Sequence, residues 1–202
     1  SSPTPNGRKI SIMLEELGVD FNPILINLDK KEQFSEHFSK ISPANKIPVI
    51  VDNDNNQTVF ESGAILLYLA KKYDKFLNKD KYWEIIQWVF FQMAYVGPML
   101  GQAHQYLFYH PGKSKFAEDK TKGYAQHIYS ILDKRLSKQE YFSDTYSIAD
   151  ISIWPWTARY ERHQINLHDY PNVLRWYKQI STRPAVIKGY NSVGEFYEIP
   201  KP

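Results

Sequence analysis

Residues 45–50 read NKIPVI, a largely β-branched strand pattern with a proline inside it, and the turn sequence DNDNNQ follows at 52–57. Pro48 cannot donate to a ladder, and interior strands normally exclude it. These residues leave two explanations open: an edge strand that starts at Pro48 with a trans bond, or a cis Ile47–Pro48 bond in a tight turn. In the cis form we expect the Ile47 N–H and C=O to face outward, where they can pair with a peptide-like ligand as an added strand.

The surrounding patterns place this strand in a small α/β unit. Apolar residues recur at helical spacing in RKISIMLEEL, and Gly18 follows as a natural helix end. FNPILINL carries the alternation typical of a strand. In chain order the patterns predict a helix, a strand, a short helix, a hairpin and a helix, over residues 8–17, 21–28, 33–41, 47–60 and 62–73.

After the polar link at 74–80, every strong signal is helical. The segment 83–96 is apolar nearly all round, which predicts a buried helix. SIAD at 147–150 matches a capping box at the start of a helix that contains Trp154 and Trp156, both expected in the core. Further helices are predicted over 115–137 and 170–180. The expected fold class is therefore α/β plus all-α, with an α/β domain at 1–75 and a helical domain at 81–202.

Composition excludes several classes of function. The 202 residues are 43% hydrophobic and include no cysteine, which excludes disulfide staples, thiolate metal sites and a cysteine nucleophile in this chain. Six histidines show no metal-ligand spacing, so no metal is expected. The net charge of +3 and the scattered lysines favour solvated helix faces over a nucleic-acid groove. No apolar run is long enough to span a bilayer, and we expect a cytoplasmic protein with no membrane partner.

A second motif, FESGAILLYLA at 60–70, adds a candidate ligand site. We expect Ser62 to cap the helix, where free N–H groups and a hydroxyl form an anion site. The carboxylate of Glu61 beside it is a cation site, so the pair matches the head group of a free α-amino acid. An ordinary helix cap with an acidic neighbour explains the same residues. Because one small domain holds both this pair and the Pro48 turn, the ligand indicated is a γ-linked peptide, glutathione.

Together these motifs identify a family resemblance over essentially the whole chain. PANKIPVIVD, FESGAILLYLA and SIADISIWPW resemble the cytosolic glutathione transferases. TPNG at 4–7, EELG at 15–18 and GPMLGQAHQY at 97–106 resemble one branch, the bacterial Nu-class enzymes and the fungal proteins related to the yeast nitrogen regulator that forms a prion. The resemblance implies a thioredoxin-like domain with a cis proline, a helical domain and a homodimer.

The resemblance also implies roles for individual residues. Thr4 and Asn6 fall where the sulfur of glutathione is activated, and donors at a helix start favour a thiolate. A capping turn formed by Thr4 and Gly7 is the alternative for that segment. The residues implied in glutathione binding, from the glycyl end to the γ-glutamyl end, are Gln33, Lys46, Ile47, Pro48, Glu61 and Ser62.

Two departures from the family pattern affect these expectations. The family has a first strand directly before the TPNG loop, whereas the sequence opens with SSPTPNG, so we expect the sheet to lack that strand. The branch also places an arginine near the start of the helix at 115–137, and only Lys115, Lys120 and Lys122 occur there. Lysine keeps the charge without the planar fork, which leaves a contact to glutathione across the dimer open.

The chemistry implied is glutathione-driven reduction of small disulfides or peroxides, with conjugation of electrophiles as a side activity. Without a cysteine, the reactive sulfur must arrive with glutathione. A different class stays open, because some relatives of this branch are regulators or dimerisation modules. Against the prion-type regulator, the sequence has no asparagine- or glutamine-rich tail; against a pure scaffold, it retains Thr4, Asn6, Glu61 and Ser62.

Overall fold

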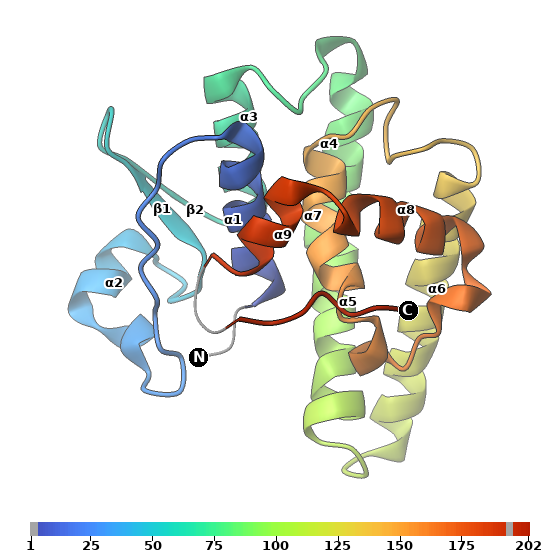
Figure 1. The fold of residues 1–202 in the computed structure, drawn as a ribbon. Coiled ribbons are helices and arrows are strands. Elements are labelled where there is room, and N and C mark those ends of the chain that lie inside the picture. The colour runs from blue at the N-terminus through green and yellow to red at the C-terminus, as the bar shows by residue number, and fades with distance from the viewer. Residues whose placement is uncertain (1–3, 193–195) are drawn as a thin grey trace.

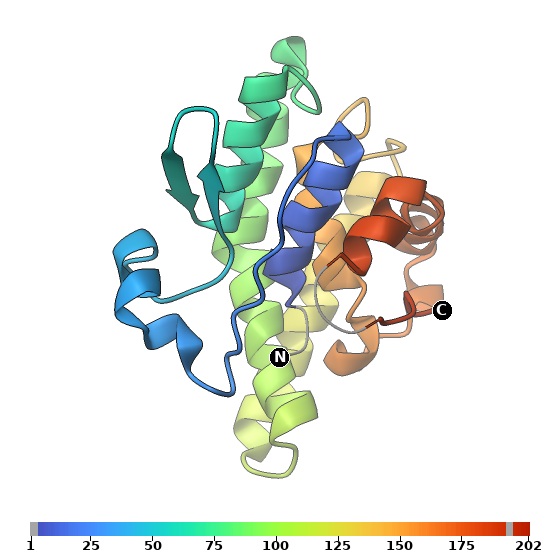
Figure 2. The same ribbon diagram turned by 60° about the vertical axis from the view of Figure 1, so that its left-hand side comes forward.

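The computed structural model describes residues 4–192 and 196–202, and it divides into a β-hairpin unit and a larger helical unit (Figure 1). In Figure 1 the hairpin and α2 lie to the left of α1 and α3, and α4 to α8 lie to the right. Figure 2 shows the hairpin and α2 on one side of α1 and the red helix α9 on the other. The elements are α1 (Pro5–Leu17), α2 (Glu36–Ile41), β1 (Val49–Asp52), β2 (Gln57–Phe60), α3 (Ser62–Tyr73), α4 (Tyr82–Phe91), α5 (Gly97–Ala103), α6 (Lys115–Leu136), α7 (Ile148–Thr157), α8 (Pro171–Ser181) and α9 (Pro184–Tyr190).

The hairpin and its proline agree with the sequence prediction. The Ile47–Pro48 bond is cis, and β1 starts directly after it. β1 pairs antiparallel with β2, with Val49 opposite Phe60. At the far end of the hairpin, the carboxylate of Asp52 accepts a hydrogen bond of 2.6 Å from the Tyr68 hydroxyl of α3. The hairpin is thereby tied to α3, and its other end is directed at the start of that helix.

The strand predicted over 21–28 is wrong. In the structure, residues 19–27 form a connection with no regular helix or strand, and Ile24 is 76% exposed. Alternating apolar residues form a strand only where a neighbouring strand supplies backbone partners. Within the described residues the sheet consists of β1 and β2 alone, and this segment is not one of its strands.

Helix α1 joins the two units. Its N-cap is Thr4, whose Oγ1 accepts a hydrogen bond from the Gly7 N–H, and Gly18 ends the helix in the left-handed conformation. On the side of α9 the two backbones approach closely, because a Cβ on Gly189 would lie 2.6 Å from the Cα of Ile12. The hydroxyl of Ser11 donates to the Gly189 carbonyl at 2.5 Å. α1 is therefore held by the last helix of the chain.

Helices α4 and α5 belong to one continuous helical stretch. A π-helical segment at Gln92–Val96 connects them, and a second one at His104–Tyr109 follows α5. The expectation that the first part of this stretch is buried all round is wrong. Trp83 and Phe90, which are seven residues apart on one face of α4, are 73% and 64% exposed. The opposite face of α4 packs on α7. The apolar pattern of α4 therefore consists of one buried face and one solvent-exposed apolar face.

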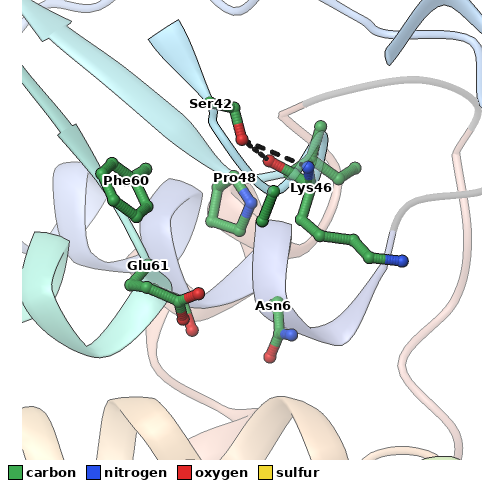
Figure 3. Close-up of a pocket in the computed structure, with 9 residues that line it drawn as sticks. Asn6, Ser42, Lys46, Pro48, Phe60 and Glu61 are labelled. Carbon is green, nitrogen blue, oxygen red and sulfur yellow. Dashed lines mark hydrogen bonds between the residues drawn. The ribbon is translucent and has the colours of Figure 1, made fainter. Parts of the chain in front are cut away.

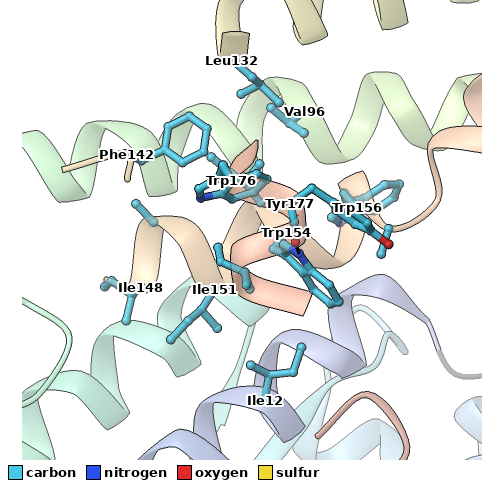
Figure 4. Close-up of a cluster of buried hydrophobic side chains, with 14 of the residues drawn as sticks. Ile12, Val96, Leu132, Phe142, Ile148, Ile151, Trp154, Trp156, Trp176 and Tyr177 are labelled. Atoms are coloured by element: carbon cyan, nitrogen blue, oxygen red, sulfur yellow. Dashed lines mark hydrogen bonds between the residues drawn. The ribbon is translucent and has the colours of Figure 1, made fainter. Parts of the chain in front are cut away.

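The capping box and the tryptophan core of the helical unit are confirmed. Asp150 accepts hydrogen bonds from the Ser147 N–H and from the Trp176 indole, at 3.0 and 2.9 Å. Trp154 and Trp156 are both buried in the cluster shown in Figure 4. The same cluster includes Ile12 of α1, so one core serves both units. None of the described helices combines the length and the hydropathy needed to cross a membrane.

Candidate functional site

A pocket of about 150 Å³ opens where the start of α1, the loop before β1 and the start of α3 meet. Figure 3 shows Glu61, Asn6 and Lys46 arranged around Pro48. Six of the eight residues predicted for the site lie in its wall. The full lining is Asn6, Ser42, Ala44, Lys46, Ile47, Pro48, Phe60, Glu61 and Ser62.

The loop before β1 presents backbone groups to this pocket. Buried Ser42 holds the loop, because its hydroxyl donates to the Lys46 carbonyl at 2.8 Å and accepts from the Lys46 N–H at 3.1 Å. Figure 3 shows both bonds. Among the described residues, the N–H and C=O of Ile47 have no hydrogen-bond partner. These groups are consequently available to the backbone of an extended ligand, and the exposed Lys46 side chain adds a positive charge at the rim.

Glu61 stands at the opposite wall, directly before α3. Its backbone has a φ of 68°, an uncommon value for a residue with a side chain and one that clusters at functional sites. Within the described part of the chain, its carboxylate has no ion-pair or hydrogen-bond partner. An unpaired carboxylate in a pocket wall is suited to bind an ammonium group.

Ser62 does not cap α3, which corrects the sequence prediction. The N-cap position is Glu61, and Ser62 is the first residue of the helix, with its side chain buried. Its Oγ instead accepts a hydrogen bond of 3.1 Å from the Nζ of Lys9. Lys9 is fully buried beneath the pocket, and this burial lowers the pKa of its ammonium group to about 7, while the negative charge of Glu61 acts in the opposite direction.

Asn6 lies in the first turn of α1 and is bonded to the helical unit. The Trp156 indole N–H donates to the Asn6 Oδ1 at 3.0 Å. Because an indole N–H can only donate, the amide oxygen must face it, and the amide NH₂ is left on the other side as a donor for a ligand. The Trp156 ring stacks on His104 with centroids 5.5 Å apart, which fixes its plane. The arrangement provides one neutral, oriented hydrogen-bond donor at the start of α1.

Thr4 and Gln33 are not among the residues that line the pocket. Thr4 serves as the cap of α1, which is the alternative that the sequence left open. Gln33 lies in a short 3₁₀ segment, Glu32–Phe34. His104, whose ring stacks on Trp156, is buried, and its burial lowers its pKa to about 3. Among the described residues, no group of three or more histidine or acidic side chains could hold a metal ion.

Sequence reasoning missed three residues that support the site: Lys9, Ser42 and Trp156. Lys9 could have been found from the sequence, because it lies four residues before Met13 on the apolar face of α1. Burying a charge on such a face is costly unless the charge has hydrogen-bond or ion-pair partners. Trp156 was expected in the core, and its position there is confirmed, but its bond to Asn6 joins residues 150 positions apart. No local pattern reports such a contact.

Comparisons with known proteins agree with this architecture. The family models for the glutathione S-transferase N-terminal and C-terminal domains match residues 2–71 and 95–184. The disulfide-bond oxidoreductase YfcG of Escherichia coli is 42% identical over 192 residues, which cover 91% of this chain and 89% of that protein. A glutathione transferase from Burkholderia graminis, solved with two glutathione molecules bound per subunit, superposes with a TM-score of 0.88 at 38% identity, over 95% of this chain and 86% of the other.

The fungal branch is represented as well. The structure of Ure2p in complex with S-hexylglutathione has a TM-score of 0.88 at 30% identity, covering 93% of this chain and 94% of that one. The protein URE2 of Debaryomyces hansenii is 30% identical over 227 residues, which cover 91% of this chain and 74% of that protein. With its hairpin unit, its helical unit and its two matching family models, the chain belongs to the cytosolic glutathione S-transferase family, in the branch that includes the Ure2-like proteins.

Proposed function

We propose that this protein reduces small disulfides and peroxides with glutathione, and that conjugation of electrophiles is a minor activity. Its family is one of glutathione-dependent enzymes, and glutathione is the cosubstrate. The observation that carries the proposal is the pocket itself, where an unpaired carboxylate, a helix start, free backbone groups and an oriented amide donor surround one space in a chain without cysteine. The relatives named disulfide-bond oxidoreductases, YfcG and YghU, support this choice of reaction.

In the proposed complex, glutathione lies across the pocket in an extended form. Its γ-glutamyl ammonium pairs with Glu61, and its α-carboxylate accepts hydrogen bonds from Ser62 and the first N–H groups of α3. The cysteinyl backbone pairs with Ile47 beside Pro48. Lys46 attracts the glycyl carboxylate, and Gln33 is assigned to the same end from the family resemblance.

The sulfur of the bound glutathione then lies at the start of α1. The Asn6 amide donates a hydrogen bond to it, and the Thr4 hydroxyl, whose oxygen already accepts from Gly7, has its own hydrogen to donate. Donors of this kind favour the thiolate over the thiol because they interact more strongly with the charged form. Both residues act as stabilisers of the nucleophile, and neither takes up its proton.

The reaction proceeds by two exchanges. The thiolate of bound glutathione attacks one sulfur of the disulfide, a new S–S bond forms, and the other sulfur leaves as a thiolate that is protonated by water. A second glutathione thiolate attacks the mixed disulfide, releasing the second thiol and leaving glutathione disulfide as the oxidised product. Solved relatives that hold two glutathione molecules or one glutathione disulfide per subunit support this order of events.

The test is a direct comparison of two assays. Purified protein is given glutathione with hydroxyethyl disulfide, and separately glutathione with a chloronitrobenzene. We expect the disulfide reaction to have the higher kcat/KM, and retention on immobilised glutathione with elution by free ligand. Protein that binds glutathione but catalyses neither reaction, nor peroxide reduction, contradicts the proposal and favours the regulatory class that the sequence left open.

We further propose a homodimer in which the α/β domain of one chain contacts the helices of the other. The open apolar face of α4, with Trp83 and Phe90, and the half-exposed Phe60 of β2 support this assembly, because contiguous exposed apolar area marks interaction sites. Light scattering should then give twice the 23.8 kDa mass of one chain. Lys115 pairs with Asp119 of its own helix.

The domain division is also proposed here, at 1–75 and 81–202. The family-model matches at 2–71 and 95–184 support a boundary between them, and the polar segment after α3 is the part of the chain best suited to it. The cytoplasmic location stays a prediction from the sequence.

A further inference from the structure

Lys9 is a charged side chain with no exposed surface, and it lies directly beneath the pocket. Its Nζ is 3.1 Å from the Ser62 Oγ, 2.5 Å from the Gln92 Oε1 and 3.7 Å from the Met93 Sδ. An ammonium group has three N–H donors, and three acceptors surround it here. No carboxylate of the described residues lies within ion-pair distance of Lys9. Among the described residues, the hydrogen-bond partners of this buried lysine are therefore neutral groups.

The surroundings of Lys9 keep its two protonation states close in free energy. On the side of α3, the charged neighbour is Glu61, which favours the ammonium form. The π-helical turn supplies Gln92 and Met93, both uncharged. Helices α7 and α9 also pack on α1, but among the described residues neither directs a charge at Lys9. Burial outweighs the attraction of Glu61 and lowers the pKa to about 7.

The two protonation states use Ser62 differently. A protonated Lys9 donates to the Ser62 Oγ, so the hydroxyl hydrogen is free to point at a ligand. A neutral amine has a lone pair and accepts that hydrogen, which turns the hydroxyl inward. The Met93 Sδ, 3.6 Å from the Ser62 Oγ, is a weak alternative acceptor when no ligand is bound. The direction of one hydroxyl thus depends on one proton.

We infer that Lys9 is a positioning residue for the α-carboxylate of the ligand, and that glutathione binding at Ser62 takes up a proton at Lys9 near neutral pH. The inference rests on the proposed binding of the γ-glutamyl group at Ser62. A carboxylate placed there adds a negative charge above the buried amine, and an opposite charge at this range favours the ammonium form. The bound carboxylate and the proton on Lys9 therefore stabilise each other, which is a coupling between two binding events.

The measurement is isothermal calorimetry with S-methylglutathione, which has no thiol to titrate. Binding is measured at pH 7.5 in phosphate and in Tris, two buffers whose ionisation enthalpies differ widely, so proton uptake appears as a difference in the observed heat. With its pKa lowered by burial to about 7, Lys9 is partly neutral at this pH, so we expect an uptake of a measurable fraction of a proton, up to about one. This measurement uses the unaltered protein and depends on no variant.

Two variants assign the proton to Lys9. Lys9→Met keeps the volume and removes the amine, and we expect it to abolish the uptake and to weaken S-methylglutathione binding about tenfold or more. Lys46→Met removes the exposed lysine of the same pocket, and we expect it to weaken binding while leaving the uptake at the wild-type value. Circular dichroism checks that each variant is folded.

Different outcomes overturn different statements. Wild-type protein that binds S-methylglutathione with equal observed heats in phosphate and in Tris, and hence no uptake, overturns the inference alone, as does Lys9→Met protein with undiminished uptake. If S-methylglutathione does not bind at all, the proposed ligand is wrong, and the inference that rests on it is overturned with it.

Discussion

The two ends of the pocket are built on opposite principles. At the end where Glu61 and Ser62 lie, the chain supplies a full negative charge on Glu61 and a titratable amine, the buried Lys9 beneath Ser62. At the other end, where Asn6 begins α1, the groups are neutral, and the nearest support is an indole N–H from the helical unit. In the proposed complex, the first end binds groups that do not change during the reaction, while the second faces the sulfur that reacts.

This difference has a chemical reason. A charge at the anchoring end increases affinity for the substrate and the transition state alike. At the sulfur, a neighbouring full cation would lower the thiol pKa further, but the nucleophilicity of a thiolate falls as its pKa falls. Neutral donors increase the thiolate fraction while keeping the sulfur reactive. Binding and activation are therefore separated in space, and substitutions at the two ends should affect different measured quantities.

The largest effect is expected on stability, from Lys9→Met at the charged end. Below pH 7 both the folded and the unfolded chain carry the proton, and the folded state bears the whole cost of a buried charge. Between the folded pKa of about 7 and the unfolded value near 10.4, only the unfolded chain holds the proton, so wild-type stability rises with pH. Lys9→Met should therefore stabilise the protein at pH 6 by ~1–4 kcal/mol. Urea unfolding should show that this gain shrinks towards pH 10; an equal gain at both pH values contradicts the assignment.

Next in size is the loss of affinity from Glu61→Gln and Ser62→Ala. Each removes a charge-assisted hydrogen bond to the γ-glutamyl group, so calorimetry should show glutathione binding weakened by about 1–3 kcal/mol. Because Ser62 is not the helix cap, Ser62→Ala should not cost the stability of a cap. Glu36→Gln on α2, whose carboxylate pairs with Lys40 at the surface, is the matched control. Unchanged affinity in both site variants would remove the ligand assignment.

Asn6→Ala should affect turnover more than affinity. The lost hydrogen bond is worth more to the ionised sulfur than to the thiol, so we expect kcat for disulfide reduction to fall by ~1–2 kcal/mol, with a small change in the glutathione Kd. The pKa in the pH–rate profile should rise, because a donor to the charged form is gone. A Kd effect as large as the kcat effect would erase the contrast between the two ends. Thr4→Ala should act in the same direction.

The smallest effect is expected from Trp156→Phe, which keeps an aromatic ring and removes the N–H that orients the Asn6 amide. We expect kcat to fall by ~0.5–1.5 kcal/mol and the pH–rate pKa to rise slightly. Trp154→Phe is the control, because Trp154 is buried in the same helix and donates to the Tyr177 carbonyl instead. In the Asn6→Ala background, Trp156→Phe should have little further effect on kcat. Equal losses in the two tryptophan variants would indicate a general packing effect.

The fold was predictable wherever a local pattern and its environment agreed. The hairpin, α3, α6, the capping box of α7 and α8 follow from turn chemistry and periodicity. The cis bond at Pro48 was left open by the local residues and was implied by the family resemblance. The strand prediction for 21–28 failed because a strand forms only by pairing with a second strand. The alternation of apolar residues in one segment does not show whether such a partner is present. The prediction that the helix carrying Trp83 and Phe90 is buried all round failed for a related reason. An apolar helix face does not specify whether its packing partner belongs to the same chain.

The site was predictable as a set of residues and less so as a mechanism. The motifs around Pro48 and Glu61 converge on one pocket with Asn6 and Lys46, although they come from separate elements. The supports beneath them were not visible in the motifs. Ser62 matched the sequence signature of a cap, but its hydroxyl is used by Lys9, because the backbone of Glu61 takes the cap position with a positive φ. Whether such a serine caps the helix or accepts a hydrogen bond from a buried lysine depends on tertiary contacts that the local sequence does not show.

The close approach of α9 to α1 has a consequence for how such chains can recombine. Gly189 fits against the backbone of Ile12 only because it has no side chain, and Ser11 donates to its carbonyl. The first helix of the hairpin unit thus depends on a glycine near the far end of the chain. A chimera that joins the first unit of one relative to the helical unit of another must inherit a matching α9, or the foreign side chain will displace α1 and with it Asn6. The two units match separate family models, but the contact between α1 and α9 requires them to be exchanged together.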